Sequence, residues 1–237
     1  MRISKLKNYK NALTLGGVNK KEIIKKTADF VKNKLSGEGT GHDWWHTYRV
    51  WRVAGEIMKK EKGADLFVVE LAALLHDIAD WKFYNGDDSV GPKVAAAWLK
   101  KVKVSEGIIS QVASIIKNLS FKGAGVKSKI NTKEGMIVQD ADRLDALGAV
   151  GIARTFAYGG AKGREIYNPE IRPVKHKNFE QYKKSQGTSL NHFYEKLFLL
   201  KNLMNTKAGK EIAMARHKFT AEYVKEFLEE WGGKDYK

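Results

Sequence analysis

The stretch ADLFVVELAALLHDIAD, residues 64–80, decides the fold class of this chain. Its apolar residues leave no polar stripe, a pattern typical of a helix that is buried on most sides. The same stretch ends with His76, Asp77 and Asp80, three polar groups at the edge of an apolar core. Burying a carboxylate is costly unless it is paired or bound to a cation. The end of this helix is therefore either satisfied by polar neighbours or holds a ligand.

Helical periodicity continues on both sides of this stretch, and no long run alternates with period two. The pattern predicts helices over 18–35, 42–62, 64–80, 89–101, 105–118, 132–158, 188–204 and 207–231. Residues 159–187 are rich in glycine and lysine, with two prolines, and predict a long surface excursion. With no internal repeat and no shift in composition, we expect a single all-α domain.

Composition narrows the function classes. The 237 residues are 43% hydrophobic with three prolines, which indicates a soluble globular protein. No apolar run is long enough to span a membrane, and the basic start of the chain has too short an apolar stretch for a secretory signal, so we expect a cytoplasmic protein. The absence of cysteine excludes disulfides, thiolate zinc sites and cysteine nucleophiles. Any metal ion must be bound by His, Asp or Glu.

The formal net charge of +16 raises the question of nucleic acid. The lysines are spread over many segments, and most of them lie beside helix-forming apolar residues. This distribution favours solvated helix faces over a dedicated nucleic-acid surface. A positive field also suits a small substrate with several negative charges, because it raises the rate of encounter with anions.

Three predicted helices each place a metal-capable residue on a face that otherwise looks buried. His46 is in phase with Val50 and Val53, His76 follows a pair of small alanines, and Asp142 is in phase with apolar neighbours and flanked by Asp140 and Asp145. A lone histidine on an apolar face is more often a satisfied core residue. Two histidines and several aspartates on three apolar helices favour metal coordination.

This order of residues, His…His-Asp…Asp, resembles that of the HD-domain metal-dependent phosphohydrolases. The segments HDWWHTYRV, AALLHDIADWKF, VQDADRLDALGAVGIARTF, LNHFYEKL and MNTKAGKEIAMARHKF together resemble a subfamily of bacterial and archaeal predicted HD hydrolases. The resemblance implies a helical HD-domain fold over 18–237, with a core at about 42–158 and C-terminal helices over 188–231. Residues 1–17 form an N-terminal extension outside the pattern.

By this resemblance, the metal ligands are His46, His76, Asp77 and Asp142. Two imidazoles and two carboxylates suit Mn²⁺, Fe²⁺, Co²⁺, Ni²⁺ or Mg²⁺ better than a closed structural zinc site. The resemblance also makes Asp80 the base that orients a water molecule, and its spacing from His76 and Asp77 places it on the same helical side. The alternative for Asp80 is a surface aspartate at a helix C-terminus, which the helix dipole disfavours.

Phosphoryl transfer also needs cations that stabilise negative charge on oxygen. Arg49 lies one turn from His46, Lys82 follows Asp80, and Arg143 follows Asp142 but points about 100° away from it. These three are candidate phosphate contacts. Arg49 and Lys82 are equally open to the interpretation of surface charge, and the direction of Arg143 favours that interpretation. His42 and Lys196 are weaker candidates for substrate binding, and Asp43 is a candidate helix cap.

The function expected from these residues is metal-dependent hydrolysis of a small phosphorylated metabolite, a nucleotide and in particular a nucleoside triphosphate. A phosphodiesterase that acts on RNA or a cyclic nucleotide is the alternative that the charge supports. A non-catalytic regulator that binds nucleotide or metal is the third candidate. Retention of all four candidate ligands together with Asp80 argues against it.

Overall fold

The computed structural model describes residues 14–15, 18–37, 43–79, 87, 89–119, 128–174 and 187–234. Regular structure in these ranges is helical, apart from one antiparallel pair of two-residue strands, β1 (Thr14–Leu15) and β2 (Val18–Asn19). The all-α prediction is confirmed. Among the described helices, none is both long enough and apolar enough to cross a membrane.

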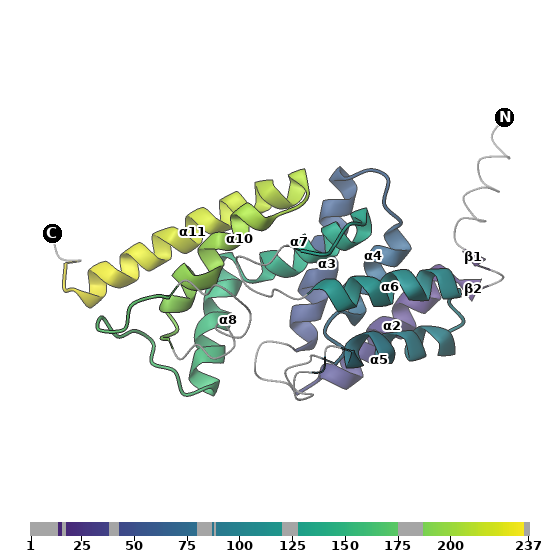
Figure 1. The fold of residues 1–237 in the computed structure, drawn as a ribbon, viewed down its shortest axis with the longest axis horizontal. Coiled ribbons are helices and arrows are strands. Elements are labelled where there is room, and N and C mark those ends of the chain that lie inside the picture. Colours follow the sequence, from purple (N-terminus) through teal and green to yellow (C-terminus); the bar gives the residue numbers. More distant parts are fainter. Residues whose placement is uncertain are drawn as a thin grey trace.

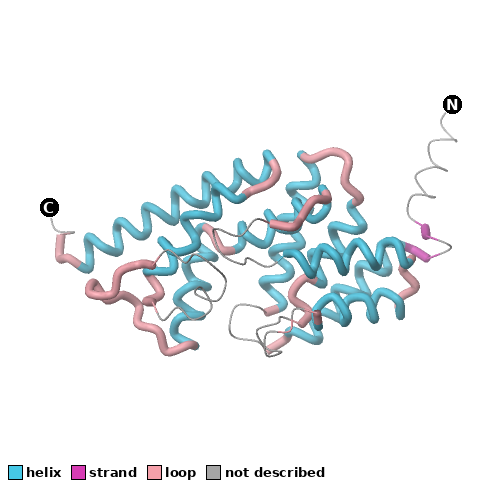
Figure 2. The backbone as a smooth tube through the Cα atoms, in the orientation of Figure 1, coloured by secondary structure: helices cyan, strands magenta, loops and turns pink. Residues whose placement is uncertain are grey.

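The elements are arranged in two groups joined by a central pair (Figures 1 and 2). The first group lies toward the N-terminus and the second toward the C-terminus, with α3 and α7 between them (Figure 1). The first group contains α2 (Lys20–Leu35), α4 (Leu66–Leu75), α5 (Val90–Lys101) and α6 (Glu106–Leu119), the central pair is α3 (Trp44–Lys60) and α7 (Lys133–Asp145), and the second group contains α8 (Gly148–Ala161), α10 (Phe198–Leu200) and α11 (Lys207–Trp231).

Helix α4 is the centre of the core. Asp65 caps its start by accepting a hydrogen bond from Phe67 N, and nearly all of its residues are buried. Helices α2, α3, α6 and α7 pack around it. The predicted buried helix is therefore confirmed, but it ends at Leu75. Residues 76–79 form a turn, so the expected continuation of the helix to 80 is wrong over this range.

The single helix expected over 132–158 is two helices. Helix α7 ends at Asp145, Leu147 is extended, and Gly148 begins α8 with φ +76°, in the left-handed region that glycine adopts without strain. A side chain at Gly151 would also collide with the backbone of Ala146. Two glycines therefore permit a sharp corner, and this corner follows directly on the last residues of α7.

The segment expected to form one helix over 188–204 is mixed. It contains a π-helical turn, η2 (Phe193–Leu197), then α10, then a 3₁₀ turn, η3 (Lys201–Leu203). Helix α11 has the predicted bounds, 207–231, and Thr206 caps it by accepting a hydrogen bond from Gly209 N. The surface excursion expected over 159–187 starts later than predicted, because 159–161 belong to α8. Its residues 162–174 are irregular and mostly exposed.

Candidate metal centre

His46 lies in the first turn of α3 and is almost completely buried. Asp43 caps the helix, as expected, by accepting a hydrogen bond from His46 N at 2.8 Å. The imidazole Nδ1 donates to Asp145 Oδ2 at 2.7 Å, because a carboxylate can only accept. This bond directs Nε2 toward the turn that follows α4.

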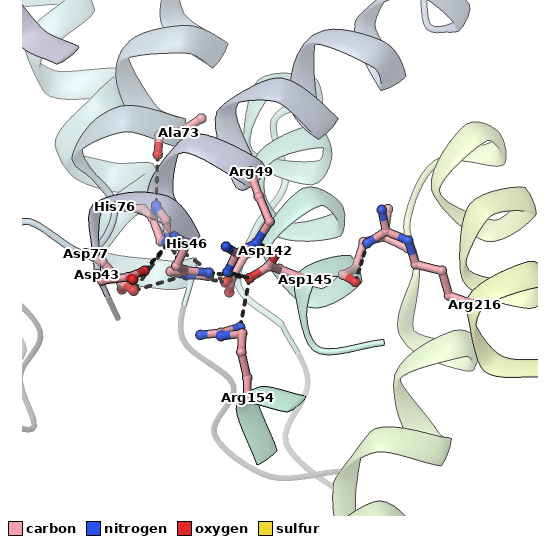
Figure 3. A network of polar contacts seen from close by, with 11 residues as sticks. Asp43, His46, Arg49, Ala73, His76, Asp77, Asp142, Asp145, Arg154 and Arg216 are labelled. Carbon is pink, nitrogen blue, oxygen red and sulfur yellow. Dashed lines mark hydrogen bonds and ion pairs between the residues drawn. The ribbon is translucent and has the colours of Figure 1, made fainter. Parts of the chain in front are cut away.

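His76 is the first residue of that turn. Its Nδ1 lies 2.8 Å from the carbonyl oxygen of Ala73, to which it must donate. The two imidazoles meet edge to face with their Nε2 atoms 3.2 Å apart. Both histidines therefore use Nδ1 for an acceptor within the protein and present Nε2 to the same point in space (Figure 3).

Two carboxylates complete this cluster. Asp77 Oδ2 lies 3.2 Å from His46 Nε2 and 3.5 Å from His76 Nε2, and Asp142 Oδ1 lies 3.5 and 3.8 Å from the same two atoms. Two nitrogen lone pairs at 3.2 Å repel each other, as do the two carboxylates, unless a cation lies among them. His46, His76 and Asp77 form a possible metal site, and the mixed nitrogen and oxygen donors fit a divalent ion.

Protons and metal ions compete for this position. Burial disfavours the charged form of His46, but the hydrogen bonds to Asp145 and Asp77 outweigh it and raise the pKa of His46 to about 9. Without a metal ion, His46 is therefore protonated at neutral pH. Metal binding needs the neutral imidazole and has to displace that proton.

Asp145, at the end of α7, connects His46 to two arginines by hydrogen bonds. Arg49 donates to both of its oxygens, from Nε at 2.7 Å and from Nη2 at 3.0 Å, and Arg154 Nη1 donates to Oδ2 at 2.9 Å (Figure 3). Burial would raise the pKa of Asp145, but the hydrogen bonds from His46 and Arg49 hold it well below its usual range. The carboxylate is thus ionised throughout the neutral range.

The other predicted site residues are placed as follows. Arg49 lies beside the cluster but is paired with Asp145. Arg143 points away from the cluster, and its Nη1 donates to the carbonyl of Leu203. Lys196 lies in η2. His42, Asp80 and Lys82 lie outside the described residues, so their roles remain predictions.

The role of Asp145 was not predicted, although it had a sequence signal. It follows Asp142 by three residues, and this spacing puts both side chains on one side of α7. Arg154 had no such signal, because a continuous helix would have carried it away from the cluster. Only the corner between α7 and α8 brings it to Asp145.

A helical core that brings His…His-Asp…Asp together between helix ends defines an HD-domain protein. The HD domain family model matches residues 44–147. YpgQ of Bacillus subtilis (strain 168) is 39% identical over 209 residues, which cover 87% of this chain and 92% of YpgQ.

Solved structures agree with this assignment. The crystal structure of an HD-superfamily hydrolase from Bacillus thuringiensis is 45% identical, with a TM-score of 0.70 over 90% of this chain and 99% of that one. The crystal structure of B. subtilis YpgQ in complex with ADP has a TM-score of 0.69 and 34% identity, over 90% of this chain and all of that one (100%). The chain belongs to the HD domain family, within the HD-superfamily hydrolases.

Proposed function

We propose that this chain is a metal-dependent phosphohydrolase that acts on a nucleotide. The observation that carries the proposal is that four donor atoms meet: His46 Nε2, His76 Nε2, Asp77 Oδ2 and Asp142 Oδ1. The two carboxylate oxygens each lie within 3.8 Å of both Nε2 atoms. An array of this kind needs a cation, and both histidines already use Nδ1 for other acceptors. The four side chains are therefore the proposed ligands of one divalent ion, Mn²⁺, Fe²⁺, Co²⁺, Ni²⁺ or Mg²⁺.

When bound, such an ion polarises a phosphoryl oxygen and lowers the pKa of a water molecule. The residues of the chain bind and orient the substrate around it. Asp142 has a side chain that is 31% exposed and Asp77 one that is 16% exposed, so the cluster is open to solvent on the carboxylate side. A phosphate group has access from that side. Asp80, three residues after Asp77, remains the proposed base.

Arg49 is the proposed phosphate contact. Its side chain is 32% exposed, and Asp145 accepts hydrogen bonds from Nε and Nη2 in a fork. Arginine has five N–H donors, so the remaining ones are available to phosphate oxygens. A guanidinium already held on one side loses little conformational freedom when it binds an anion.

A nucleotide is the proposed substrate for two reasons. YpgQ, 39% identical over most of both chains, was crystallised in complex with ADP. The net charge of +16 favours encounter with a polyphosphate. Nucleoside triphosphates are the proposed subgroup, since they carry the highest negative charge among simple nucleotides.

The test is a substrate panel with defined metal content. Protein stripped with a chelator is reloaded with each of the five ions and given nucleoside mono-, di- and triphosphates, a cyclic nucleotide and a short RNA, with product identification by mass. We expect turnover of nucleotides with at least one ion. Turnover confined to RNA or the cyclic nucleotide would favour a phosphodiesterase, and nucleotide binding without turnover under any ion would favour a regulator.

Variants assign the site in the same assay. Asp77→Ala and Asp142→Ala should lose both bound metal and turnover, whereas Asp80→Ala should keep the metal and lose turnover. Asp29→Ala is the matched control, because Asp29 is exposed on α2 in the first helix group. Full activity in Asp77→Ala would show that the ligand assignment is wrong.

A further inference from the structure

Asp145 accepts four hydrogen bonds with a side chain that is only 3% exposed. One comes from His46, two from Arg49 and one from Arg154. Its partners thus belong to α3 and α8, while Asp145 itself ends α7. A single carboxylate connects a proposed metal ligand with two arginines from different helices.

We propose that Asp145 is a positioning residue, which fixes the orientation of His46 toward the metal ion and holds Arg49 and Arg154 beside it. The proposal rests on the metal site of the proposed function and assigns a role to a residue outside its ligand set. It has two parts, one for the histidine and one for the arginines.

The histidine part follows from hydrogen-bond chemistry. A neutral imidazole has one N–H, and a carboxylate accepts but cannot donate, so Asp145 keeps the proton of His46 on Nδ1 and leaves the Nε2 lone pair for the ion. His76 obtains the same constraint from the carbonyl of Ala73. The two ligands therefore differ in their support, because only His46 is backed by a full negative charge, which makes its Nε2 a stronger donor.

The arginine part follows from charge. Two guanidinium groups near a divalent ion repel it and each other unless an anion lies between them. Asp145 lies between them, with Arg49 and Arg154 approaching it from opposite sides in Figure 3. It thereby keeps both arginines next to the cluster, where a phosphate group would meet them.

The position of Asp145 is itself fixed by α11. Arg216 Nη1 donates to the carbonyl of Leu144 at 2.6 Å, and Thr220 Oγ1 accepts from Gly148 N at 2.9 Å, on the two sides of the corner that follows Asp145. Both side chains lie beyond residues 44–147, the range matched by the family model. The C-terminal helix therefore supports the metal site from outside the matched range.

Asp140 supplies a matched control. It lies on the same helix, is fully buried, and also accepts four hydrogen bonds, but these come from Asn205 and Thr206 at the start of α11. Loss of either carboxylate removes a buried acceptor. Only Asp145 contacts a proposed metal ligand, so its loss should weaken the metal site far more than loss of Asp140.

The experiment compares Asp145→Ala, Asp145→Asn and Asp140→Ala by calorimetric titration with Mn²⁺ and, at saturating Mn²⁺, with ADP. Loss of the hydrogen-bond partner of a metal-bound histidine typically weakens metal affinity by about 10–100-fold. We expect the Kd for Mn²⁺ to rise by that factor in Asp145→Ala. It should rise less in Asp145→Asn, because the amide oxygen still accepts the hydrogen bond from His46. Asp140→Ala, whose lost partners lie at the start of α11 and not at Arg216 or Thr220, should lower thermal stability and raise the Kd for Mn²⁺ far less than Asp145→Ala does. ADP should bind more weakly to both Asp145 variants.

An Asp145→Ala protein that binds Mn²⁺ like the wild type would overturn the proposal. If that variant does not fold, two other measurements test whether Asp145 positions His46: the Kd of Asp145→Asn for Mn²⁺, and NMR of the wild-type protein without metal. The Nδ1 proton of His46 should exchange slowly and appear far downfield, and a rapidly exchanging proton would contradict the Asp145 contact. This measurement needs no metal, so it tests the inference separately from the proposed function. Failure of the proposed function would appear instead as a wild-type protein that does not bind Mn²⁺.

Discussion

Replacement of Asp140 by alanine should destabilise the protein strongly, because the Asp140 carboxylate anchors the start of α11. Its Oδ1 accepts from the backbone and side-chain nitrogens of Asn205 at 2.8 and 2.9 Å, and its Oδ2 accepts from N and Oγ1 of Thr206 at 2.7 and 2.8 Å. The two backbone donors cannot turn toward other acceptors, because they are fixed at the start of α11. Asn205 Nδ2 keeps a second acceptor in Gln139, so its loss matters less.

The magnitude follows from those two stranded donors. A buried N–H left without an acceptor costs about 1–3 kcal/mol. Thr206 N is buried and Asn205 N is partly buried, so the two together cost at most about 2–6 kcal/mol. Removal of a buried charge offsets part of this, which leaves about 3 kcal/mol. For a chain of this length each kcal/mol corresponds to about 2–4 °C, so the midpoint of thermal unfolding should fall by about 6–12 °C.

Urea denaturation followed by circular dichroism and tryptophan fluorescence is the assay. The midpoint concentration should fall in Asp140→Ala with an unchanged slope, since the surface exposed on unfolding stays the same. The exposed Asp29→Ala serves as the reference for a carboxylate without these contacts. A midpoint for Asp140→Ala equal to that of Asp29→Ala would refute the assignment of Asp140 as the anchor of α11.

Further predictions concern two glycines and a proton. A side chain at Gly209 would run into the carboxylate of Asp140, so Gly209→Ala should destabilise by about 1–3 kcal/mol, whereas Gly55, inside α3 with no heavy atom within 4 Å of an added Cβ, should gain about 0.5–1 kcal/mol on replacement by alanine. Urea midpoints that move in the same direction would contradict this contrast. Since the pKa of His46 is raised to about 9, its proton stabilises the metal-free protein below pH 6.5, and this contribution is lost as the pH rises through 9. Metal binding at neutral pH should therefore release about one proton and tighten as the pH rises toward 9. Calorimetry in buffers of different ionisation enthalpy measures the release, and none at pH 7 would contradict it.

The sequence predicted the helical elements best where a cap and a periodic face agree. Helix α11 has the expected bounds because Thr206 marks its start and Gly232 its end. The corner at Gly148 was missed because the apolar pattern continues through it, and periodicity does not detect a break that glycine makes possible. The early end of α4 at Leu75 was missed because the apolar pattern continues past it through the buried Ile78 and Ala79.

The sequence motif indicated which four side chains lie together, and their role as metal ligands stays a prediction. His46, His76, Asp77 and Asp142 meet as their motif and inward-facing phases indicated. The partner of Arg49 was not predicted, because contacts between residues 96 positions apart depend on packing rather than on local spacing. The same is true of the contacts that Arg154 and Arg216 make around the end of α7.

The most direct test of the metal centre is a crystal structure of the protein grown with Mn²⁺, with data collected for anomalous scattering. We expect one strong anomalous peak at bonding distance from Nε2 of His46 and His76 and from carboxylate oxygens of Asp77 and Asp142. A crystal saturated with Mn²⁺ that has no peak among these four side chains, or whose strongest peak lies elsewhere, would contradict the account.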